Sequence, residues 1–300
     1  MSQQQELNLI QEKLHRFSWG ETIYEMRTNF ETLFSMDPHP NAIVEEVNAF
    51  GVTADLISTP ASKQNKVILY LHGGGYLVGS RNSYRRLASD ISEASKAKVL
   101  LIEYRLAPEH PFPAALDDAL IAYKWLIGEG GFSPKNIAVA GDSAGGNLAL
   151  AMLLALRDME PKKEKSLPVA TLLISPFTDM QGSGSTIQSK ADVDLMVTPE
   201  LIDAVVNMYL PNGDTSKPIL SPILADLSGL PPMLIHVGNQ EILLDDSLRL
   251  ARKAALDDVS VELKVWKDMI HCFQLFAPIL SQGRKAVVEG GDFLAYYLNI

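Results

Sequence analysis

The sequence predicts an α/β fold built on a mostly parallel central sheet with helices on both of its faces. Three observations predict it: short apolar segments recur along the chain, turn residues bound each of them, and helical stretches separate them. Runs this short and apolar suit strands that are buried on both faces, as in a parallel sheet. A regular alternation of such strands with helices is typical of an α/β domain. At 300 residues the chain fits one such domain or two small ones.

The elements are expected in the following order. Apolar residues recur at helical spacing in the first forty residues, first at Leu7, Ile10, Leu14 and Phe17 and then at Ile23, Met26, Phe30, Leu33 and Phe34. Short stretches typical of strands follow at 44–47 and 52–57. We expect six further strands, at 67–71, 99–102, 137–140, 170–174, 233–237 and 261–265. We expect the helices between and after them at 83–95, 114–127, 145–156, 243–256 and 284–298.

One region interrupts this alternation. Residues 177–214 contain no strand pattern, a stretch rich in glycine and serine, and one expected helix at 199–208. Ligand sites in such folds lie at the carboxyl ends of the strands. We therefore expect this insertion to pack with the N-terminal helices as a cap over that edge. The alternative is two peripheral helical additions with no role in binding.

Composition and charge exclude several classes of protein. The chain has 26 Lys and Arg against 36 Asp and Glu, so its net charge is −10, and nucleic acids and anionic membranes both bind basic faces. Cys272 is the single cysteine, which excludes an internal disulfide framework and a cysteine-based zinc site. The longest apolar run, 148–156, is too short to span a bilayer, and the N-terminus has no secretory signal pattern. We expect a soluble, cytoplasmic protein.

The most informative motif is Gly141-Asp142-Ser143-Ala144-Gly145, which lies between an expected strand and an expected helix. A Gly-x-Ser-x-Gly match by itself is weak evidence, but this context is the one that the motif requires. A serine on a sharp strand-to-helix turn needs neighbours without large side chains. The turn presents its hydroxyl at a helix N-terminus, where developing negative charge is stabilised. The alternative interpretation is a glycine-rich turn with an N-capping serine.

A second motif, His72-Gly73-Gly74-Gly75-Tyr76, directly follows the expected strand 67–71. Successive glycines let backbone N–H groups converge on one point, as an oxyanion hole requires. A flexible loop or a phosphate-binding loop is the alternative. The latter would need Gly-Lys-Ser or Gly-Lys-Thr at its end, which the sequence lacks.

A serine nucleophile needs a base. Of the six histidines, only His271 combines a loop after the last strand with the chain order serine, acid, histidine. His236 lies inside an apolar strand, where we expect a buried and hydrogen-bonded side chain. His271 is therefore the expected base.

The acid that orients the base is expected between strand 233–237 and His271. Glu241 comes soon after that strand and is favoured over Asp245. Asp245 and Asp246 fall in a first helical turn, where the helix dipole favours acids without any catalytic role. Asp246 is interpreted as a solvated surface acid.

These motifs together resemble the hormone-sensitive-lipase-like family of α/β-hydrolases, the bacterial carboxylesterases also called family IV. The resemblance runs from about Val67 to the C-terminus. It rests on the stretches His72-Gly-Gly-Gly, Tyr104-Arg-Leu-Ala-Pro-Glu-His-Pro, Gly141-Asp-Ser-Ala-Gly-Gly and Met269-Ile-His-Cys-Phe. It implies a single α/β-hydrolase domain over 1–300, with a cap formed by about 1–42 and 177–214.

The resemblance also implies roles for individual residues. Ser143 would be the nucleophile and His271 the base. The backbone N–H groups of Gly73, Gly74 and Ala144 would form the oxyanion hole. Tyr76 at the end of the glycine motif and Asp142 before the serine are candidate substrate-binding residues. In the Tyr104 block we expect Arg105 and Glu109 to form an internal ion pair.

The sequence departs from the family pattern at two positions. The family acid usually lies in Asp-Pro-Leu-x-Asp, whereas this chain has Glu241-Ile-Leu-Leu-Asp245, so a glutamate replaces the aspartate and the proline is absent. Cys272 follows the expected base where the family often has glycine. Its thiol is either an inert buried group or a site sensitive to thiol reagents.

The expected function is therefore that of a serine carboxylesterase that hydrolyses short- to medium-chain esters through an acyl-enzyme, without a metal or another cofactor. A lactone hydrolase with the same triad and a non-catalytic relative that binds small molecules are the alternatives. Epoxide hydrolases and dehalogenases of this fold would need an aspartate at position 143. The expected partners are a small-molecule ester and, through 261–265 and 284–298, a second copy of the chain.

Overall fold

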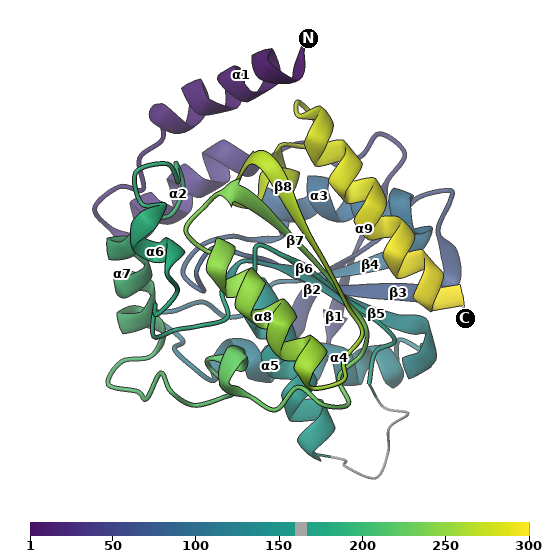
Figure 1. Ribbon diagram of the computed structural model, residues 1–300. Helices are drawn as coiled ribbons and strands as arrows, with labels where there is room; N and C mark the ends of the chain where they lie inside the picture. Colours follow the sequence, from purple (N-terminus) through teal and green to yellow (C-terminus); the bar gives the residue numbers. More distant parts are fainter. Residues whose placement is uncertain (160–166, 300) are drawn as a thin grey trace.

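The predicted sheet is present in the computed structural model, which describes residues 1–159 and 167–299 (Figure 1). Eight strands of this part of the chain form one sheet in the order β1-β2-β4-β3-β5-β6-β7-β8. Their bounds are β1 (Ile43–Ala49), β2 (Val52–Ser58), β3 (Lys63–Leu71), β4 (Ala97–Ile102), β5 (Ile137–Asp142), β6 (Thr171–Ile174), β7 (Met233–Gln240) and β8 (Val261–Ile270). Strand β2 runs antiparallel to both β1 and β4, and all pairs from β4 to β8 are parallel. The predicted fold class is confirmed.

Helices cover both faces of the sheet. The helices α3 and α9 pack against each other above the sheet in the view of Figure 1, whereas α4, α5 and α8 lie below it. The longer helices are α1 (Gln3–His15), α2 (Ile23–Phe34), α3 (Arg81–Ser95), α4 (Ala114–Ile127), α5 (Ala144–Met159), α7 (Pro199–Tyr209), α8 (Leu244–Leu256) and α9 (Ser281–Asn299). The short helix α6 (Thr186–Ser189) was not expected from the sequence, because one turn of helix leaves no periodic pattern.

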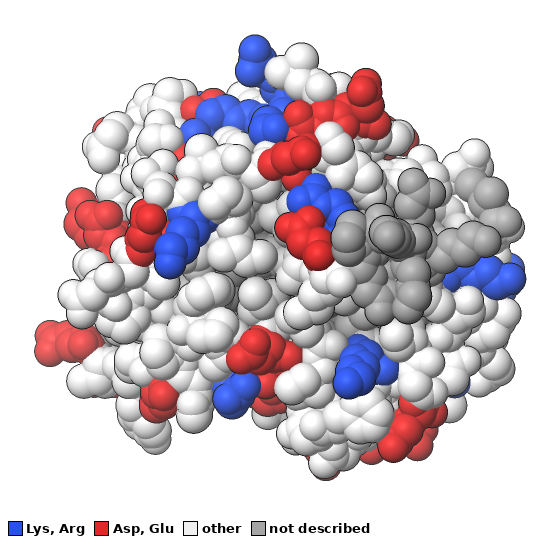
Figure 2. All heavy atoms as spheres, turned by 90° about the horizontal axis from the view of Figure 1, so that it is seen from below, with Lys and Arg blue, Asp and Glu red and all other residues white. Residues whose placement is uncertain are grey.

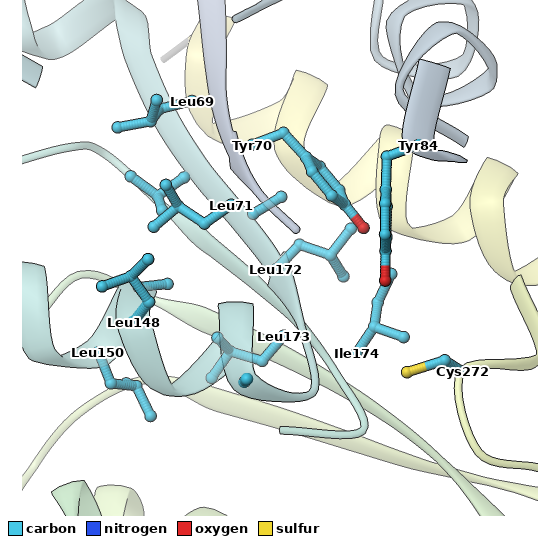
Figure 3. Packing of buried hydrophobic residues seen from close by; sticks show 14 of the residues in the cluster. Leu69, Tyr70, Leu71, Tyr84, Leu148, Leu150, Leu172, Leu173, Ile174 and Cys272 are labelled. Carbon is cyan, nitrogen blue, oxygen red and sulfur yellow. The ribbon is translucent and has the colours of Figure 1, made fainter. Parts of the chain in front are cut away.

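The core explains why the central strands are apolar throughout. Along β3, Leu71 lies on the side of Leu148 in α5, whereas Tyr70 lies on the opposite side, beside Tyr84 of α3 (Figure 3). Side chains alternate between the two faces of a strand, so a strand between two helical layers must be apolar at every position. Strand β5 is buried along its whole length for the same reason.

The N-terminal helices and the 177–214 insertion come together although they are far apart in sequence. In Figure 1, α2 lies next to α6 and α7 at one side of the sheet. The Trp19 indole N–H donates to the Met196 carbonyl at 3.0 Å. Helix α1 is joined to the start of α9 by Glu6, whose carboxylate accepts from the backbone N–H and the hydroxyl of Ser281. Both segments are thereby fixed to the body of the domain.

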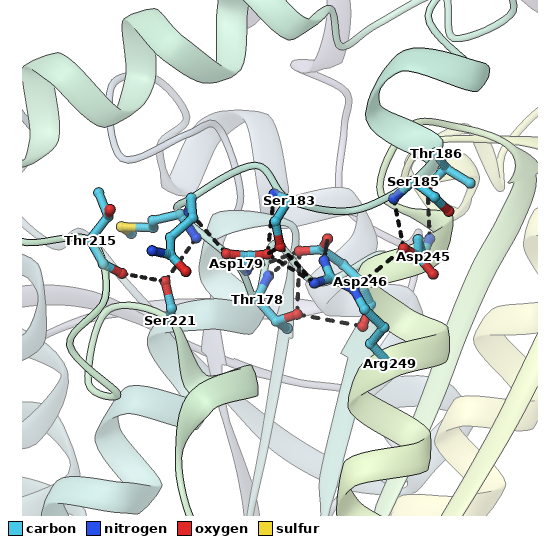
Figure 4. A network of polar contacts seen from close by, with 12 residues as sticks. Thr178, Asp179, Ser183, Ser185, Thr186, Thr215, Ser221, Asp245, Asp246 and Arg249 are labelled. Carbon is cyan, nitrogen blue, oxygen red and sulfur yellow. Dashed lines mark hydrogen bonds and ion pairs between the residues drawn. The ribbon is translucent and has the colours of Figure 1, made fainter.

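Two expectations about charged residues are wrong. Arg105 pairs with Asp118 at 2.8 Å, and Glu109 pairs with Arg27 at 2.6 Å, because each arginine meets the carboxylate that the fold brings to it. Asp246 is buried, with 1% of its surface exposed. Its carboxylate accepts from the backbone N–H groups at Thr178 and Asp179 and pairs with Arg249, so it joins α8 to the start of the insertion (Figure 4).

The surface agrees with the acidic composition. On the face that Figure 2 shows, lysine and arginine side chains are interspersed with acidic ones, and the basic residues form no continuous patch there. Among the helices of the described ranges, none combines the length and the apolar character needed to cross a bilayer.

Candidate active site

Ser143 lies at the turn between β5, which ends at Asp142, and α5, which begins at Ala144. Its backbone has a φ of +52°, in the left-handed region that non-glycine residues rarely occupy. This strained turn lifts the serine out of the sheet at the N-terminus of a long helix, where the helix dipole favours negative charge. Ser143 lines a pocket that it shares with His271.

The two glycines of the serine motif permit close backbone packing. A Cβ atom at Gly145 would lie 2.0 Å from the Leu71 carbonyl oxygen and 2.4 Å from that of His72. A Cβ atom at Gly141 would lie 2.4 Å from the Gly145 carbonyl oxygen. Any side chain at either position would therefore push the serine turn away from the end of β3, where the glycine loop begins.

The glycine loop corrects the expected set of oxyanion donors. The N–H of Gly73 donates to Asp142 Oδ1 at 3.0 Å and is therefore not free to bind a substrate. Gly74 and Gly75 have φ of +103° and +62° and line the pocket. Within the described ranges, the N–H groups of Gly74, Gly75 and Ala144 have no hydrogen-bond partner. The free donors belong to Gly75 as well as to Gly74 and Ala144, and not to Gly73.

The Asp142 carboxylate supports this loop from below. Besides the Gly73 N–H, it accepts from the Tyr70 hydroxyl at 2.9 Å and the Tyr84 hydroxyl at 2.8 Å. The two hydroxyl groups lie next to each other in Figure 3. Burial raises the pKa of Asp142, although the hydrogen bonds from Tyr84 and Tyr70 lower it. Three protein donors occupy its carboxylate, so Asp142 shapes the loop, and the residue also lines the pocket, so its expected contact with substrate stays a prediction.

Tyr76 lies outside the pocket. Its hydroxyl donates to Asn147 Oδ1 at 2.7 Å, and its ring stacks on Tyr209 with 3.7 Å between ring centroids. It is buried and does not belong to the residues that line the pocket. The same Asn147 donates to the carbonyl groups of Phe177 and Leu220. Tyr76 therefore joins the glycine loop to α5 and α7, and the structure does not place it in the pocket where a substrate contact was expected.

The structure brings Glu241 to His271. Glu241 Oε2 lies 2.6 Å from His271 Nδ1. The other carboxylate oxygen accepts from the Gly238 N–H at 2.7 Å and from the Ser175 hydroxyl at 2.9 Å. The additional methylene of glutamate is thus accommodated, because the carboxylate turns back toward the end of β7. Asp245 instead accepts from the Ser185 N–H and does not face the histidine.

The Glu241 carboxylate and the His271 imidazole shift the pKa of each other. Burial lowers the pKa of His271, but the hydrogen bond and charge of Glu241, together with the charges of Asp194 and Asp142, outweigh that effect, so the pKa of the imidazole is raised. Burial raises the pKa of Glu241, while its hydrogen bond with His271 lowers it. A carboxylate that binds Nδ1–H leaves Nε2 as the proton acceptor.

Cys272 occupies the other side of the same imidazole. Its Sγ lies 3.3 Å from His271 Nε2, and the residue lines the pocket. Burial raises the pKa of the thiol well above its usual value, so the group is a thiol and not a thiolate at neutral pH. Its backbone φ is +49°, which explains why glycine suits this position in the family.

The other buried histidines have different environments. His72 stacks on Tyr104 and contacts its neighbouring Gly73 carbonyl through Nδ1. His236 is buried as expected, and its Nε2 lies 3.6 Å from Glu289 Oε1, which is too long for a hydrogen bond. Burial lowers the pKa of each to about 4. Neither contacts the serine pocket.

The pocket is lined mainly by apolar side chains from three parts of the chain. The N-terminal segment contributes Trp19, Met26 and Phe30, and the insertion contributes Phe177, Met196, Val197, Leu201, Ile202 and Val205. The body of the domain contributes the glycine loop, Ser143 and the base, together with Leu77, Val78, Tyr84, Asp142, Leu243, Cys272 and Leu275. An apolar wall beside a serine suits the hydrocarbon part of a small substrate. In the described ranges, no cluster of three or more His, Cys, Asp or Glu side chains could hold a metal ion.

Sequence reasoning missed two residues of this site. Gly75 belongs to the quoted glycine motif, but its free N–H could be recognised only once the Asp142–Gly73 hydrogen bond was known. Ser175, which donates to Glu241, follows β6 as a lone serine, and no motif identifies it.

Comparisons with known proteins agree on the type of protein. A family model described as the alpha/beta hydrolase fold matches residues 68–275. An acetyl-hydrolase of Streptomyces hygroscopicus is 39% identical over 235 residues, which cover 78% of this chain and 77% of that protein. An esterase of Acinetobacter venetianus is 34% identical over 256 residues, covering 85% and 82%. The crystal structure of an esterase from the bacterial hormone-sensitive lipase family is 38% identical, with a TM-score of 0.92 and coverage of 99% and 98%.

Proposed function

Since this chain belongs to the hormone-sensitive-lipase-like carboxylesterases of the α/β-hydrolase fold, we propose that it hydrolyses short- to medium-chain carboxylic esters through an acyl-enzyme on Ser143. One observation carries the proposal: the strained Ser143 turn and the Glu241–His271 pair, at 2.6 Å, meet at one apolar pocket. A serine, a base and an orienting acid are the parts that acyl transfer needs.

In the proposed reaction, Ser143 Oγ attacks the ester carbonyl while His271 Nε2 takes its proton. Glu241 holds Nδ1–H and stabilises the imidazolium that forms. The imidazolium then protonates the departing alkoxide, which leaves as an alcohol. Water attacks the acyl-enzyme with the same base, and the acid product and the free serine are released.

The negative charge of each tetrahedral intermediate needs donors that are already in position. We assign this role to the N–H groups of Gly74, Gly75 and Ala144, which have no other partner within the described ranges. In comparable sites the loss of one such donor costs about 3–4 kcal/mol of transition-state stabilisation.

The cap is part of the same proposal. We propose that residues of about 1–42 and 177–214 form it within a single domain over 1–300. The support is that Trp19, Met26 and Phe30 line the pocket opposite residues of the insertion. Such a cap would bound the space for the acyl and alcohol groups.

The substitution S143A tests the catalytic assignment. We expect it to abolish hydrolysis of p-nitrophenyl acetate and labelling by a fluorophosphonate probe, with an unchanged circular dichroism spectrum. Retained hydrolysis would contradict the assignment. A series of p-nitrophenyl acetate, butyrate, octanoate and palmitate, with a lactone included, tests the preference for short and medium acyl chains.

Cytoplasmic location and a homodimer are proposed on sequence grounds. Strand β8 is an edge strand, and Val265 in this strand and Val288 in α9 are exposed, which suits pairing with a second copy. Size-exclusion chromatography with light scattering tests the dimer, and fractionation of the producing cell tests the location.

A further inference from the structure

A buried carboxylate from the insertion lies behind the acid–base pair. Asp194 is 6% exposed. One of its oxygens, Oδ1, accepts from the backbone N–H groups of Met196 and Val197, each at 2.9 Å. The other, Oδ2, accepts from the N–H of Ile242 at 2.9 Å, across 48 residues of sequence. Three backbone donors therefore hold this side chain in one orientation.

Asp194 connects the apolar wall of the pocket with the turn that carries Glu241. Met196 and Val197 line the apolar pocket, and the Met196 carbonyl accepts from Trp19. Ile242 is the residue directly after Glu241. A single carboxylate thus connects the pocket wall with the peptide unit next to the acid.

A second contact strengthens the same connection. The Thr186 hydroxyl donates to the Ile242 carbonyl at 2.7 Å and accepts from the Asp245 N–H at 2.9 Å. The insertion therefore holds both the N–H and the carbonyl of Ile242. The insertion thus helps to fix the backbone of the turn that carries Glu241.

We infer that Asp194 is a positioning residue for ester hydrolysis, which holds the Glu241 turn against the pocket wall and supplies a second negative charge behind the Glu241–His271 pair. This inference rests on the proposed roles of Ser143, Glu241 and His271.

The described ranges show no ion pair of Asp194 with a cation, and its negative charge raises the pKa of both His271 and Glu241. The titratable groups that face His271 are Glu241 after β7, Asp142 at the end of β5, Asp194 from the insertion and the Cys272 thiol. Burial lowers the pKa of His271, whereas Glu241, then Asp194 and Asp142, raise it. The imidazolium that forms during catalysis is thus stabilised by a carboxylate that does not touch it.

The substitution D194N separates charge from shape. The amide keeps the size of the side chain and can still accept from Met196 and Val197, but it carries no charge and turns an N–H₂ toward the Ile242 N–H. We expect kcat for p-nitrophenyl acetate to fall roughly ten-fold, because the acid and base lose their alignment. The acid limb of the kcat/KM profile should move to lower pH by roughly half a unit or more, because the protonated imidazole loses a stabilising charge.

Active enzyme is counted by the burst of p-nitrophenol from an organophosphate ester, so that a loss of folded protein does not count as a loss of kcat. A merely structural role would reduce the burst and leave the acid limb in place. A second variant, D194S, is used if D194N does not fold. Its hydroxyl can still accept from the local backbone N–H groups, but it is too short to contact the Ile242 N–H and it carries no charge. We therefore expect the same shift of the acid limb to lower pH.

Asp246 provides the matched control. It too is a buried carboxylate that accepts from backbone N–H groups of the insertion, but it pairs with Arg249. We expect D246N to lower stability without moving the acid limb. An unchanged acid limb in D194N and D194S, or an equal shift in D246N, would overturn the inference. Activity in H271A would instead refute the proposed function, whereas an inactive H271A with a normal D194N refutes only the role of Asp194.

Discussion

Removal of the Asp142 carboxylate should damage both the stability of the protein and the glycine loop. Three donors meet this side chain: the Gly73 N–H at 3.0 Å and the hydroxyls of Tyr70 and Tyr84 at 2.9 and 2.8 Å. All three donors belong to buried residues. The substitution D142A leaves these donors without a partner.

The expected cost follows from the number of donors. Each buried polar group that loses its partner costs about 1–3 kcal/mol, so three donors should cost about 3–6 kcal/mol of unfolding free energy, allowing for partial relaxation. Because the Gly73 peptide precedes the proposed oxyanion donors at Gly74 and Gly75, its release should also lower kcat by roughly ten-fold or more.

The substitution D142N is the matched comparison. Its amide oxygen can accept from Tyr70 and Gly73, which both donate to Oδ1, and its N–H₂ can donate to the Tyr84 hydroxyl. Since burial raises the pKa of Asp142, an uncharged amide is a close substitute for it. We therefore expect D142N to lie within about 1–2 kcal/mol of the wild type and to keep most of its kcat.

Urea unfolding followed by tryptophan fluorescence measures stability, and p-nitrophenyl acetate hydrolysis per active site measures kcat. The single substitutions Y70F and Y84F each remove one donor and should cost about 1 kcal/mol. The reasoning fails if D142A unfolds at the same urea concentration as the wild type, or if D142N is as damaging as D142A. In the second case the charge, and not the set of hydrogen bonds, would hold the loop.

Two further predictions concern the base and its neighbour. Glu241, with Asp194 and Asp142, outweighs burial and raises the pKa of His271, so the acid limb of kcat/KM should lie above the ordinary histidine value of 6.5, and activity should fall as the pH drops through it. The substitution E241Q should move this limb to lower pH and lower kcat by roughly a thousand-fold or more, and an unmoved limb in E241Q contradicts this. The buried Cys272 thiol should react with iodoacetamide at pH 8 more slowly than free cysteine does. The substitution C272G suits the φ of +49°, so this variant should resist the reagent fully and keep an activity within a few-fold of the wild type. Rapid inactivation of the wild type or of C272G speaks against this prediction.

The helices and strands that a local sequence pattern determines could be predicted from the sequence alone. The expected helix 114–127 coincides with α4, and the six expected central strands lie within β3 to β8 apart from Ala170, which precedes β6. The reason is that a strand between two helical layers leaves a continuous apolar run and a helix leaves a helical period, and both can be recognised without knowing any partner. The order of the strands in the sheet leaves no such period and came only from the structure.

Features that depend on partners distant in sequence could not be predicted. Nothing near Gly73 in the sequence indicates that a carboxylate 69 residues away takes its N–H. Arg105 lies four residues before Glu109 but meets Asp118, because α4 brings the latter to it. Asp246 has the sequence context of an exposed helix start, yet the insertion covers it. In each case the local interpretation was chemically reasonable, and a distant segment determined the outcome.

The same dependence on distant segments has a consequence for specificity. A path of hydrogen bonds connects the pocket wall with the residue that would orient the base. It runs from the Trp19 indole N–H to the Met196 carbonyl, from the Met196 N–H to Asp194, and from Asp194 to the N–H of the residue after Glu241. Because Met196 takes part in this path through its backbone carbonyl and N–H, a substitution that enlarges the pocket at Met196 keeps these hydrogen bonds and changes mainly the volume for the acyl chain. Under the proposed roles, variants at Met196 and at Val205, which both line the pocket, should act mainly on the longer acyl chains, whereas D194N, which removes the carboxylate from this path, should lower kcat even for acetate, the smallest acyl group of the series.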